Sequence, residues 1–238
     1  MNVGRRDAAW ALAGLLVLVA WEASGADMAV MRLIADAQGF AWRDAPLATA
    51  LHSGGRVVAW LLLAVLALDV LRPFARHGPS RQTRAFWLAV VLSTAVLVPG
   101  LKRLSSTSCP WDLAPFGGLA PYVPHWLLSV ADGGPGHCFP SGHAVAVLAF
   151  IGVYFLWREH RPGLARGIAA AVWGLGAVYG TVQVLRGAHF VSHVWWAAWL
   201  CWVIAAAADA ALRWRAASCR TGRPSPAAPA AWRQKARL

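Results

Sequence analysis

The chain has 238 residues, of which 58% are apolar and 13% charged, whereas soluble domains are about 45–50% apolar and about 25% charged. This composition, with 15 tryptophans, excludes an ordinary soluble globule and indicates a membrane protein. The net charge of +12 does not indicate nucleic-acid binding. Lys and Arg stand in short clusters between long apolar runs and form no basic stripe interleaved with aromatic residues, so no nucleic-acid partner is expected.

Apolar runs that reach spanning length, roughly 17–25 residues once flanking residues are counted, occur six times. They predict an all-α fold, a six-span transmembrane helical bundle, with spans near residues 8–22, 56–71, 85–101, 141–157, 167–185 and 190–212. We therefore expect a membrane domain over residues 1–212. The basic tail, residues 213–238, is rich in Arg, Pro, Ala and Ser and is predicted to be disordered.

The distribution of Lys and Arg predicts the orientation of these spans. With alternating spans, 16 of the 22 Lys and Arg residues fall on the side of the two termini. The positive-inside rule then places both termini in the cytoplasm of a bacterial-type cell and the segments 23–55, 102–140 and 186–189 outside the inner membrane. The first run also fits a cleaved secretory signal peptide, because two arginines precede it and small residues follow it. That alternative leaves the remaining topology unchanged.

Segment 23–55 is long for a loop. Its methionines, leucine and isoleucine alternate with Asp and Arg between residues 27 and 36, which predicts a short amphipathic helix lying in the outer membrane interface. An irregular loop fits this segment equally well.

Three polar clusters lie at the outer ends of the predicted spans. The first begins at Lys102 and Arg103 and includes Cys109; the second covers residues 138–143; the third covers residues 183–193. Hydropathy alone does not require these clusters to share one membrane depth on one side. Their coincidence therefore indicates a functional site on the outer face.

The first two clusters and an arginine of the third have the chemistry of an anion site. Ser141 and Gly142 follow a proline and open a predicted helix, whose free N–H groups favour a phosphate or oxyanion. Lys102 and Arg186 supply positive charge, and an arginine binds two phosphate oxygens at once. Each cation alone is also explained as a boundary residue that snorkels to the interface.

Three histidines fall in the same region: His143 in the first helical turn, and His189 and His193 four residues apart. One neutral imidazole can attack phosphorus, a second can protonate the leaving oxygen, and a third can fix the tautomer of the nucleophile. Zinc binding is the alternative for this set. We expect no metal, because the two cations would repel the ion. No carboxylate other than Asp112 is a candidate to complete the ligand set.

The sequence Pro140-Ser141-Gly142-His143, preceded by the Lys102 cluster and followed by His189, resembles the type 2 phosphatidic acid phosphatase superfamily, which also contains the vanadium haloperoxidases. The resemblance covers residues 102–193 and implies six spans with a site at the outer surface. It implies phosphate contacts from Lys102, Ser141 and Gly142, a general acid at His143 and a nucleophile at His189, with no metal or organic cofactor.

Three positions depart from the motifs of that superfamily. Cys109 and Gln183 stand where the motifs have arginines, and His193 stands where an aspartate orients the nucleophile. We predict that Arg186, one helical turn from Gln183, restores one cation, and that a neutral His193 accepts a hydrogen bond from His189. Loss of activity through these changes is the alternative.

Cys109 and Cys138 lie in the same outer segment. Because the compartment outside the inner membrane is oxidising, we predict a Cys109–Cys138 disulfide that ties the first motif to the second; two reduced thiols are the alternative. Cys201 and Cys219 are expected to be free.

These observations predict an integral-membrane phosphatase that hydrolyses a phosphorylated membrane lipid at the outer face through a phosphohistidine. Substrates consistent with the resemblance are polyprenyl diphosphate, phosphatidylglycerol phosphate, phosphatidic acid and lipid A phosphate. A lipid phosphotransferase with the same site, and a non-catalytic protein that binds or transports phospholipids, are the alternatives. The sequence indicates no oligomeric state.

Overall fold

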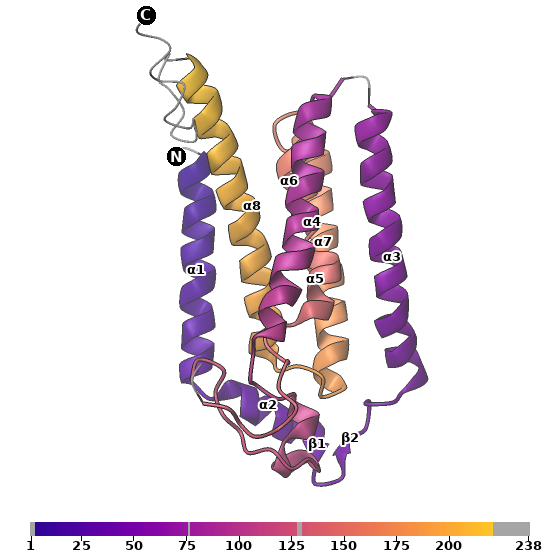
Figure 1. The fold of residues 1–238 in the computed structure, drawn as a ribbon, viewed down its shortest axis with the longest axis vertical. Helices are drawn as coiled ribbons and strands as arrows, with labels where there is room; N and C mark the ends of the chain where they lie inside the picture. The colour runs from indigo at the N-terminus through magenta and orange to yellow at the C-terminus, as the bar shows by residue number, and fades with distance from the viewer. Residues whose placement is uncertain (1–2, 76, 128–129, 221–238) are drawn as a thin grey trace, which may run out of the picture.

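The computed structural model describes residues 3–75, 77–127 and 130–220. Long helices run side by side through the bundle, and two short helices, end to end, complete it (Figure 1). The long helices are α1 (Val3–Ala23), α3 (Pro46–Leu71), α4 (Arg81–Arg103), α7 (Pro162–Leu185) and α8 (Val191–Arg220), and the short ones are α5 (Gly142–Leu148) and α6 (Ile151–Trp157).

Every one of the predicted spans coincides with helix, so the predicted all-α transmembrane bundle is confirmed. Within the described residues, four helices (α3, α4, α7 and α8) are long and apolar enough to cross a membrane on their own. α1 meets that test only together with α2 (Ala26–Ile34), at a bend of 66°. The α5–α6 stretch, Gly142–Trp157, is shorter. The predicted count of six full spans is therefore approximate, although the chain passes through the bundle at all six predicted places.

The segment after α1 forms a cap at one end of the bundle (Figure 1). α2 is the short outer helix that the sequence predicts, and the hairpin of β1 (Ala35–Asp36) and β2 (Gly39–Phe40), which it does not predict, follows. Asp36 closes the turn by accepting a 2.9 Å hydrogen bond from the backbone N–H of Gln38. Two short 3-10 helices, η1 (Pro110–Asp112) and η2 (Ala114–Phe116), complete the cap.

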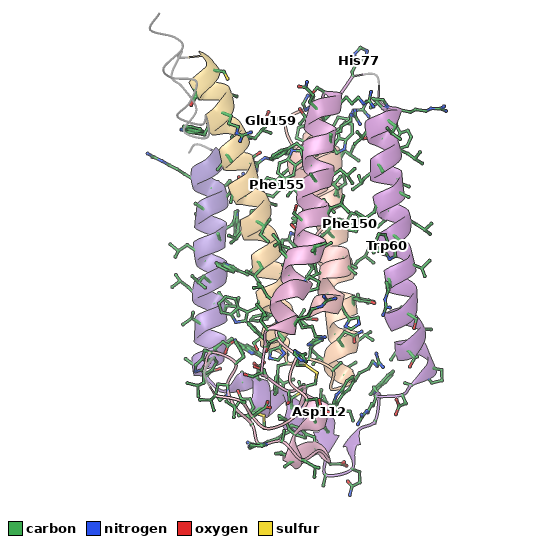
Figure 2. All side chains as sticks on the ribbon, viewed as in Figure 1. Trp60, His77, Asp112, Phe150, Phe155 and Glu159 are labelled. Atoms are coloured by element: carbon green, nitrogen blue, oxygen red, sulfur yellow. A yellow bond between two sulfur atoms is a disulfide. The ribbon has the colours of Figure 1, made fainter. Side chains whose placement is uncertain are left out.

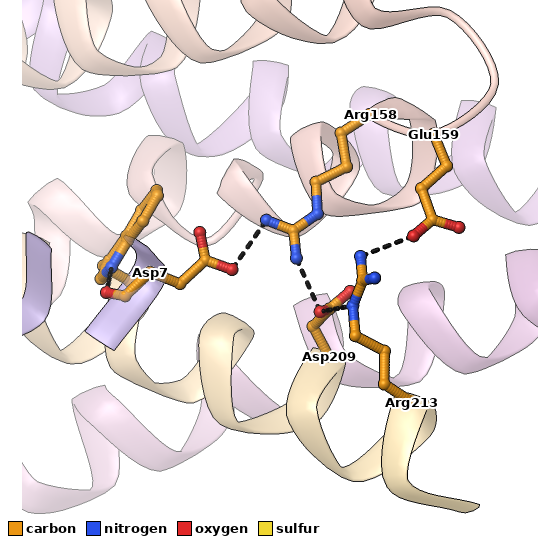
Figure 3. A network of polar contacts seen from close by, with 6 residues as sticks. Asp7, Arg158, Glu159, Asp209 and Arg213 are labelled. Carbon is orange, nitrogen blue, oxygen red and sulfur yellow. Dashed lines mark hydrogen bonds and ion pairs between the residues drawn. The ribbon is translucent and has the colours of Figure 1, made fainter. Parts of the chain in front are cut away.

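Buried charges at the other end of the bundle attach α1 to the rest of the protein. Arg158 donates to Asp7 of α1 at 2.8 Å and to Asp209 of α8 at 2.6 Å, and Arg213 shares Asp209 (Figure 3). The indole N–H of Trp199 also donates to a backbone carbonyl of α1 at 2.8 Å. Breaking a buried pair of this kind costs about 3–5 kcal/mol. These contacts attach α1 to α8 and to the residue that follows α6.

Asp69, a carboxylate within the second predicted span, is also paired. It accepts a hydrogen bond from the buried side chain of Arg84, the guanidinium of which lies 5.1 Å above the ring of Trp157. Ionisable groups at membrane depth are costly unless they are paired in this way. α3 otherwise presents apolar side chains outward, as Trp60 does with 67% exposure (Figure 2).

The helix that contains the predicted domain boundary at residue 212 continues beyond it. α8 continues to Arg220, and the disorder predicted for residues 213–220 is wrong, because Arg213 pairs with Asp209 and Glu159 on the bundle. The rest of the predicted tail, residues 221–238, lies outside the described residues.

Candidate functional site

The three polar clusters meet at the cap end of the bundle, where Asp112 marks the cap in Figure 2. A disulfide joins Cys109 and Cys138 with a Cα–Cα distance of 5.1 Å, as the sequence predicts. The backbone N–H of Cys138 donates to Thr107 at 2.9 Å, and that of His137 donates to Ser105 at 2.8 Å. The segment that follows α4 is thus attached along its length to the segment that precedes α5.

The three histidines converge. His189 lies in the turn between α7 and α8, where Gly187 adopts a positive φ of 72°, and its backbone N–H donates to the carbonyl of Gln183 at 3.3 Å. The ring of His189 is 6.1 Å from that of His143 and 5.9 Å from that of His193, measured between centroids. Segments distant in the sequence therefore place two imidazoles beside the predicted nucleophile.

Lys102 and Ser141 lie at the start of α5. The half-buried stem of Lys102 passes over this helix start, since a Cβ added at Gly142 would lie 3.5 Å from its Cδ. The Ser141 backbone N–H donates to the carbonyl of His193 at 3.0 Å, so the expectation that this N–H is free for an anion is wrong. The buried Ser141 hydroxyl has no hydrogen-bond partner among the described residues.

Arg186 faces the cap instead of the histidines. Its Nε donates to the backbone carbonyl of Arg43 at 2.9 Å, and its Nη1 is buried without a partner in the part of the chain that the structure describes. The cation whose charge acts on the His189 imidazole is Lys102. The predicted role of Arg186 as the replacement for a motif arginine stays a prediction, and its anchoring to the cap argues for a minor one.

His193 does not hold His189 as expected. Within the described chain, no hydrogen bond joins the two rings, and the Nδ1 of His193 is buried without a partner. The group beside the Nδ1 of His189 is instead the sulfur of Cys138, at 3.5 Å. Cys138 thus lies beside the Nδ1 of His189, the position that the sequence analysis assigns to His193.

Burial dominates the electrostatics of His189, which is 1% exposed. Desolvation lowers the pKa of His189 well below 6.5, and the charges of His193, Lys102 and His143 lower this pKa further. The Cys138 backbone carbonyl, which favours the protonated ring, partly opposes the shift. The imidazole is therefore neutral near pH 7, the form that has a lone pair for nucleophilic attack.

The sequence analysis missed a group of residues behind His193. Asp27 of α2 accepts a hydrogen bond from the Ser192 backbone N–H at 3.0 Å and so satisfies an N–H at the start of α8. Glu22 pairs with His125 at 3.1 Å, and the His125 ring stacks on Phe139 at 3.9 Å, next to the second motif. Their charges are visible in the sequence, but their partners are far away along the chain and only the fold brings them together.

One cluster of potential metal ligands lies in this site: Cys138, His189 and His193, with ligand atoms within 4.8 Å of one another. The sulfur of Cys138 is bonded to Cys109 and so is not the thiolate that binds zinc. Two imidazoles do not make up the ligand set of a zinc site. The residues present fit a metal ion poorly.

Comparisons with known proteins show the family of the chain and a similar fold. The chain matches the family model described as the PAP2 superfamily over residues 84–216, more than half of its length. A search of curated proteins finds no match. The fold is similar to a crystal structure described as the first transmembrane PAP2 type phosphatidylglycerolphosphate phosphatase from Bacillus subtilis, with a TM-score of 0.54 and 18% identity, covering 85% of this chain and 96% of that one.

Proposed function

Because the chain belongs to the PAP2 superfamily, we propose that this multi-pass membrane protein is a lipid phosphate phosphatase that acts through a phosphohistidine. The observation that supports this proposal most strongly is the approach of the buried His189 ring to His143, at 6.1 Å between centroids. Reacting atoms meet at about 3–3.5 Å, so one phosphoryl group between the two rings contacts both.

His189 is the proposed nucleophile. Its Nε2 attacks phosphorus and a bond forms between them, while the bond from phosphorus to the lipid oxygen breaks. His143, in its protonated form, gives a proton to that leaving oxygen. Water then attacks the phosphohistidine, His143 accepts a proton from the water, and inorganic phosphate leaves.

Lys102 and Ser141 are the proposed phosphate ligands. The half-buried ammonium of Lys102, the stem of which crosses the start of α5, neutralises charge on the phosphoryl oxygens. The Ser141 hydroxyl, 0% exposed, donates a hydrogen bond in a site that excludes water, where such contacts are strong. Gly142 belongs to this set because the lysine stem lies beside it, 3.5 Å from where a Cβ would stand.

The proposed substrate is a phosphorylated lipid that enters sideways from the bilayer, because the site lies at the ends of apolar helices. We place the cap end in the periplasm and both termini in the cytoplasm, since 16 of the 22 Lys and Arg residues fall on the side of the termini. Phosphatidylglycerol phosphate, the substrate named for the similar structure, heads the panel to be tested.

Phosphate release from purified lipid phosphates tests the proposal. The panel contains phosphatidylglycerol phosphate, phosphatidic acid, a polyprenyl diphosphate and lipid A phosphate, each with and without vanadate or EDTA. We expect release from at least one lipid, inhibited by vanadate and insensitive to EDTA. Transfer of phosphate to a lipid acceptor without release would instead establish a phosphotransferase, and binding without turnover would contradict the proposal.

A further inference from the structure

The disulfide between Cys109 and Cys138 does more than link two segments, because one of its sulfurs contacts His189. The sulfur of Cys138 lies 3.5 Å from the Nδ1 of His189 and 2.9 Å from the carbonyl oxygen of Ala188. Cys138 is 0% exposed, so bulk solvent does not reach its side chain. A sulfur in a disulfide carries no hydrogen, so in a hydrogen bond with Nδ1 it is the acceptor and the imidazole is the donor.

This direction of donation determines the tautomer of His189. A neutral imidazole has one N–H, and the nitrogen that carries it is set by the hydrogen bond made there. If Nδ1 holds the hydrogen, Nε2 keeps the lone pair. We propose that Cys138, held by its disulfide to Cys109, is a positioning residue for His189: its sulfur accepts the Nδ1–H and leaves Nε2 free to attack phosphorus. This inference rests on the proposed function.

The same disulfide fixes the backbone that carries His189. Trp111, two residues beyond Cys109, donates its backbone N–H to the carbonyl of Gly187 at 3.0 Å. Cys138 touches the next residue, Ala188, from the other half of the disulfide. The turn before His189 is therefore held by both linked segments, and the ring of His189 is fixed at Nδ1. An aspartate is not needed for this role, which explains how His193 can stand in its place.

Reduction would reverse the hydrogen bond. A dithiol such as dithiothreitol supplies two electrons and two protons, the S–S bond breaks, and both cysteines become thiols while the dithiol forms a cyclic disulfide. The Cys138 S–H can then donate to Nδ1, which favours the tautomer with hydrogen on Nε2. That tautomer has no lone pair directed at phosphorus, so we expect phosphate release to depend on the oxidised disulfide.

Two readouts on the full-length protein test the proposal. The first is the ¹⁵N spectrum of histidine-labelled protein, with the His189 signals assigned by their loss in His189→Ala. The second is kcat and KM for phosphate release. The variant Cys109→Ala/Cys138→Ala removes the acceptor sulfur, and Cys219→Ser, at an exposed free cysteine, is the matched control.

In the wild type and in the control we expect the hydrogen on Nδ1. In the double variant we expect a mixture of tautomers and a kcat lower by about 10–100-fold, by analogy with the loss of a group that orients a metal-binding histidine, with KM changed less than twofold. A merely structural disulfide would instead leave the His189 tautomer unchanged, and that result would overturn the proposal, as would an unchanged kcat.

Reduction of the folded wild type provides the same comparison if the double variant does not fold. Dithiothreitol should shift the His189 tautomer and lower kcat, and reoxidation should restore both; a spectrum that stays constant while both cysteines become alkylatable would overturn the proposal. The NMR readout also separates this inference from the proposed function. A wild type that releases no phosphate from any lipid contradicts the function, whereas the tautomer alone decides the role of Cys138.

Discussion

The two ends of the bundle both bury polar groups, but they satisfy them differently. Away from the cap, two nitrogens of Arg158 are paired with Asp7 and Asp209, and its Nε is buried without a partner among the described residues. At the cap end, the Ser141 hydroxyl and the Nδ1 of His193 are buried without hydrogen-bond partners among the described residues. Buried polar groups are normally satisfied. The ion pairs hold the helices together at one end, whereas at the cap end the unpartnered Ser141 hydroxyl is a group that we propose contacts the phosphate.

Among the changes at the cap end, removal of the proposed nucleophile should lower kcat most. We expect His189→Ala to lower kcat by about 10⁴-fold or more, the scale of loss seen when a nucleophile is removed. The protein should remain inserted and folded, because the site contributes little to cohesion. His160→Ala, an exposed histidine at the opposite end, should release phosphate at the wild-type rate. Comparable rates for the two variants would remove His189 from the mechanism.

Lys102 and Arg186 should differ in how much their loss lowers kcat. Lys102→Met should lower kcat by about 10²–10³-fold, because it removes a charge held against the phosphoryl oxygens in a site shielded from water. Arg186→Met should cost less than about tenfold, since Arg186 is anchored to the cap carbonyl of Arg43. Arg103→Met, at the exposed end of α4, is the matched control. The opposite order of effects would assign the phosphate contact to Arg186.

The cohesive end should respond in stability and not in chemistry. Arg158→Met leaves the buried carboxylates of Asp7 and Asp209 without their shared partner, and loss of one partner of a buried pair costs about 3–5 kcal/mol. We expect a lower thermal midpoint in detergent, with kcat of the folded fraction unchanged. An unchanged midpoint would show that α1 is held mainly by its apolar contacts with α8.

The smallest expected effect is a shift in the pH profile. Attack requires neutral His189, so activity is lost as the pH falls through the pKa of His189, which burial and the neighbouring charges place below 6.5. The acidic limb of kcat/KM should therefore lie below pH 6.5. In Lys102→Met one positive charge is removed and the pKa of His189 rises. The acidic limb of the residual activity should therefore move to a higher pH. A limb that moves downward would contradict this electrostatic account.

The sequence was sufficient for the helical membrane architecture and for the proximity of the candidate site residues. Apolar runs predict every pass through the bundle, and three short motifs predict that Lys102, His143 and His189 lie together. The disulfide follows from the presence of both cysteines in one outer segment and from the expected compartment. These features are local in the sequence or depend only on alternation of the spans across the membrane.

Pairwise contacts at the site could not be predicted in the same way. The motif pattern assigns the orientation of His189 to His193, yet the sulfur of Cys138 lies at its Nδ1, and the Ser141 N–H is bonded to a backbone carbonyl. Likewise the acceptor for an N–H group at the start of α8 is Asp27, which is far away in the chain. Which of several nearby polar groups forms a bond depends on side-chain geometry within about 1 Å, and spacing in the sequence does not contain that information.

The most direct measurement of the central claim is to quench the reaction within its first turnover and locate the phosphoryl group by mass spectrometry under alkaline conditions, where a phosphohistidine survives. A lipid phosphate that the protein hydrolyses should leave the group on His189, and the signal should be absent from His189→Ala. A phosphoryl group found on another residue, or a first turnover that releases phosphate from His189→Ala, would contradict the account.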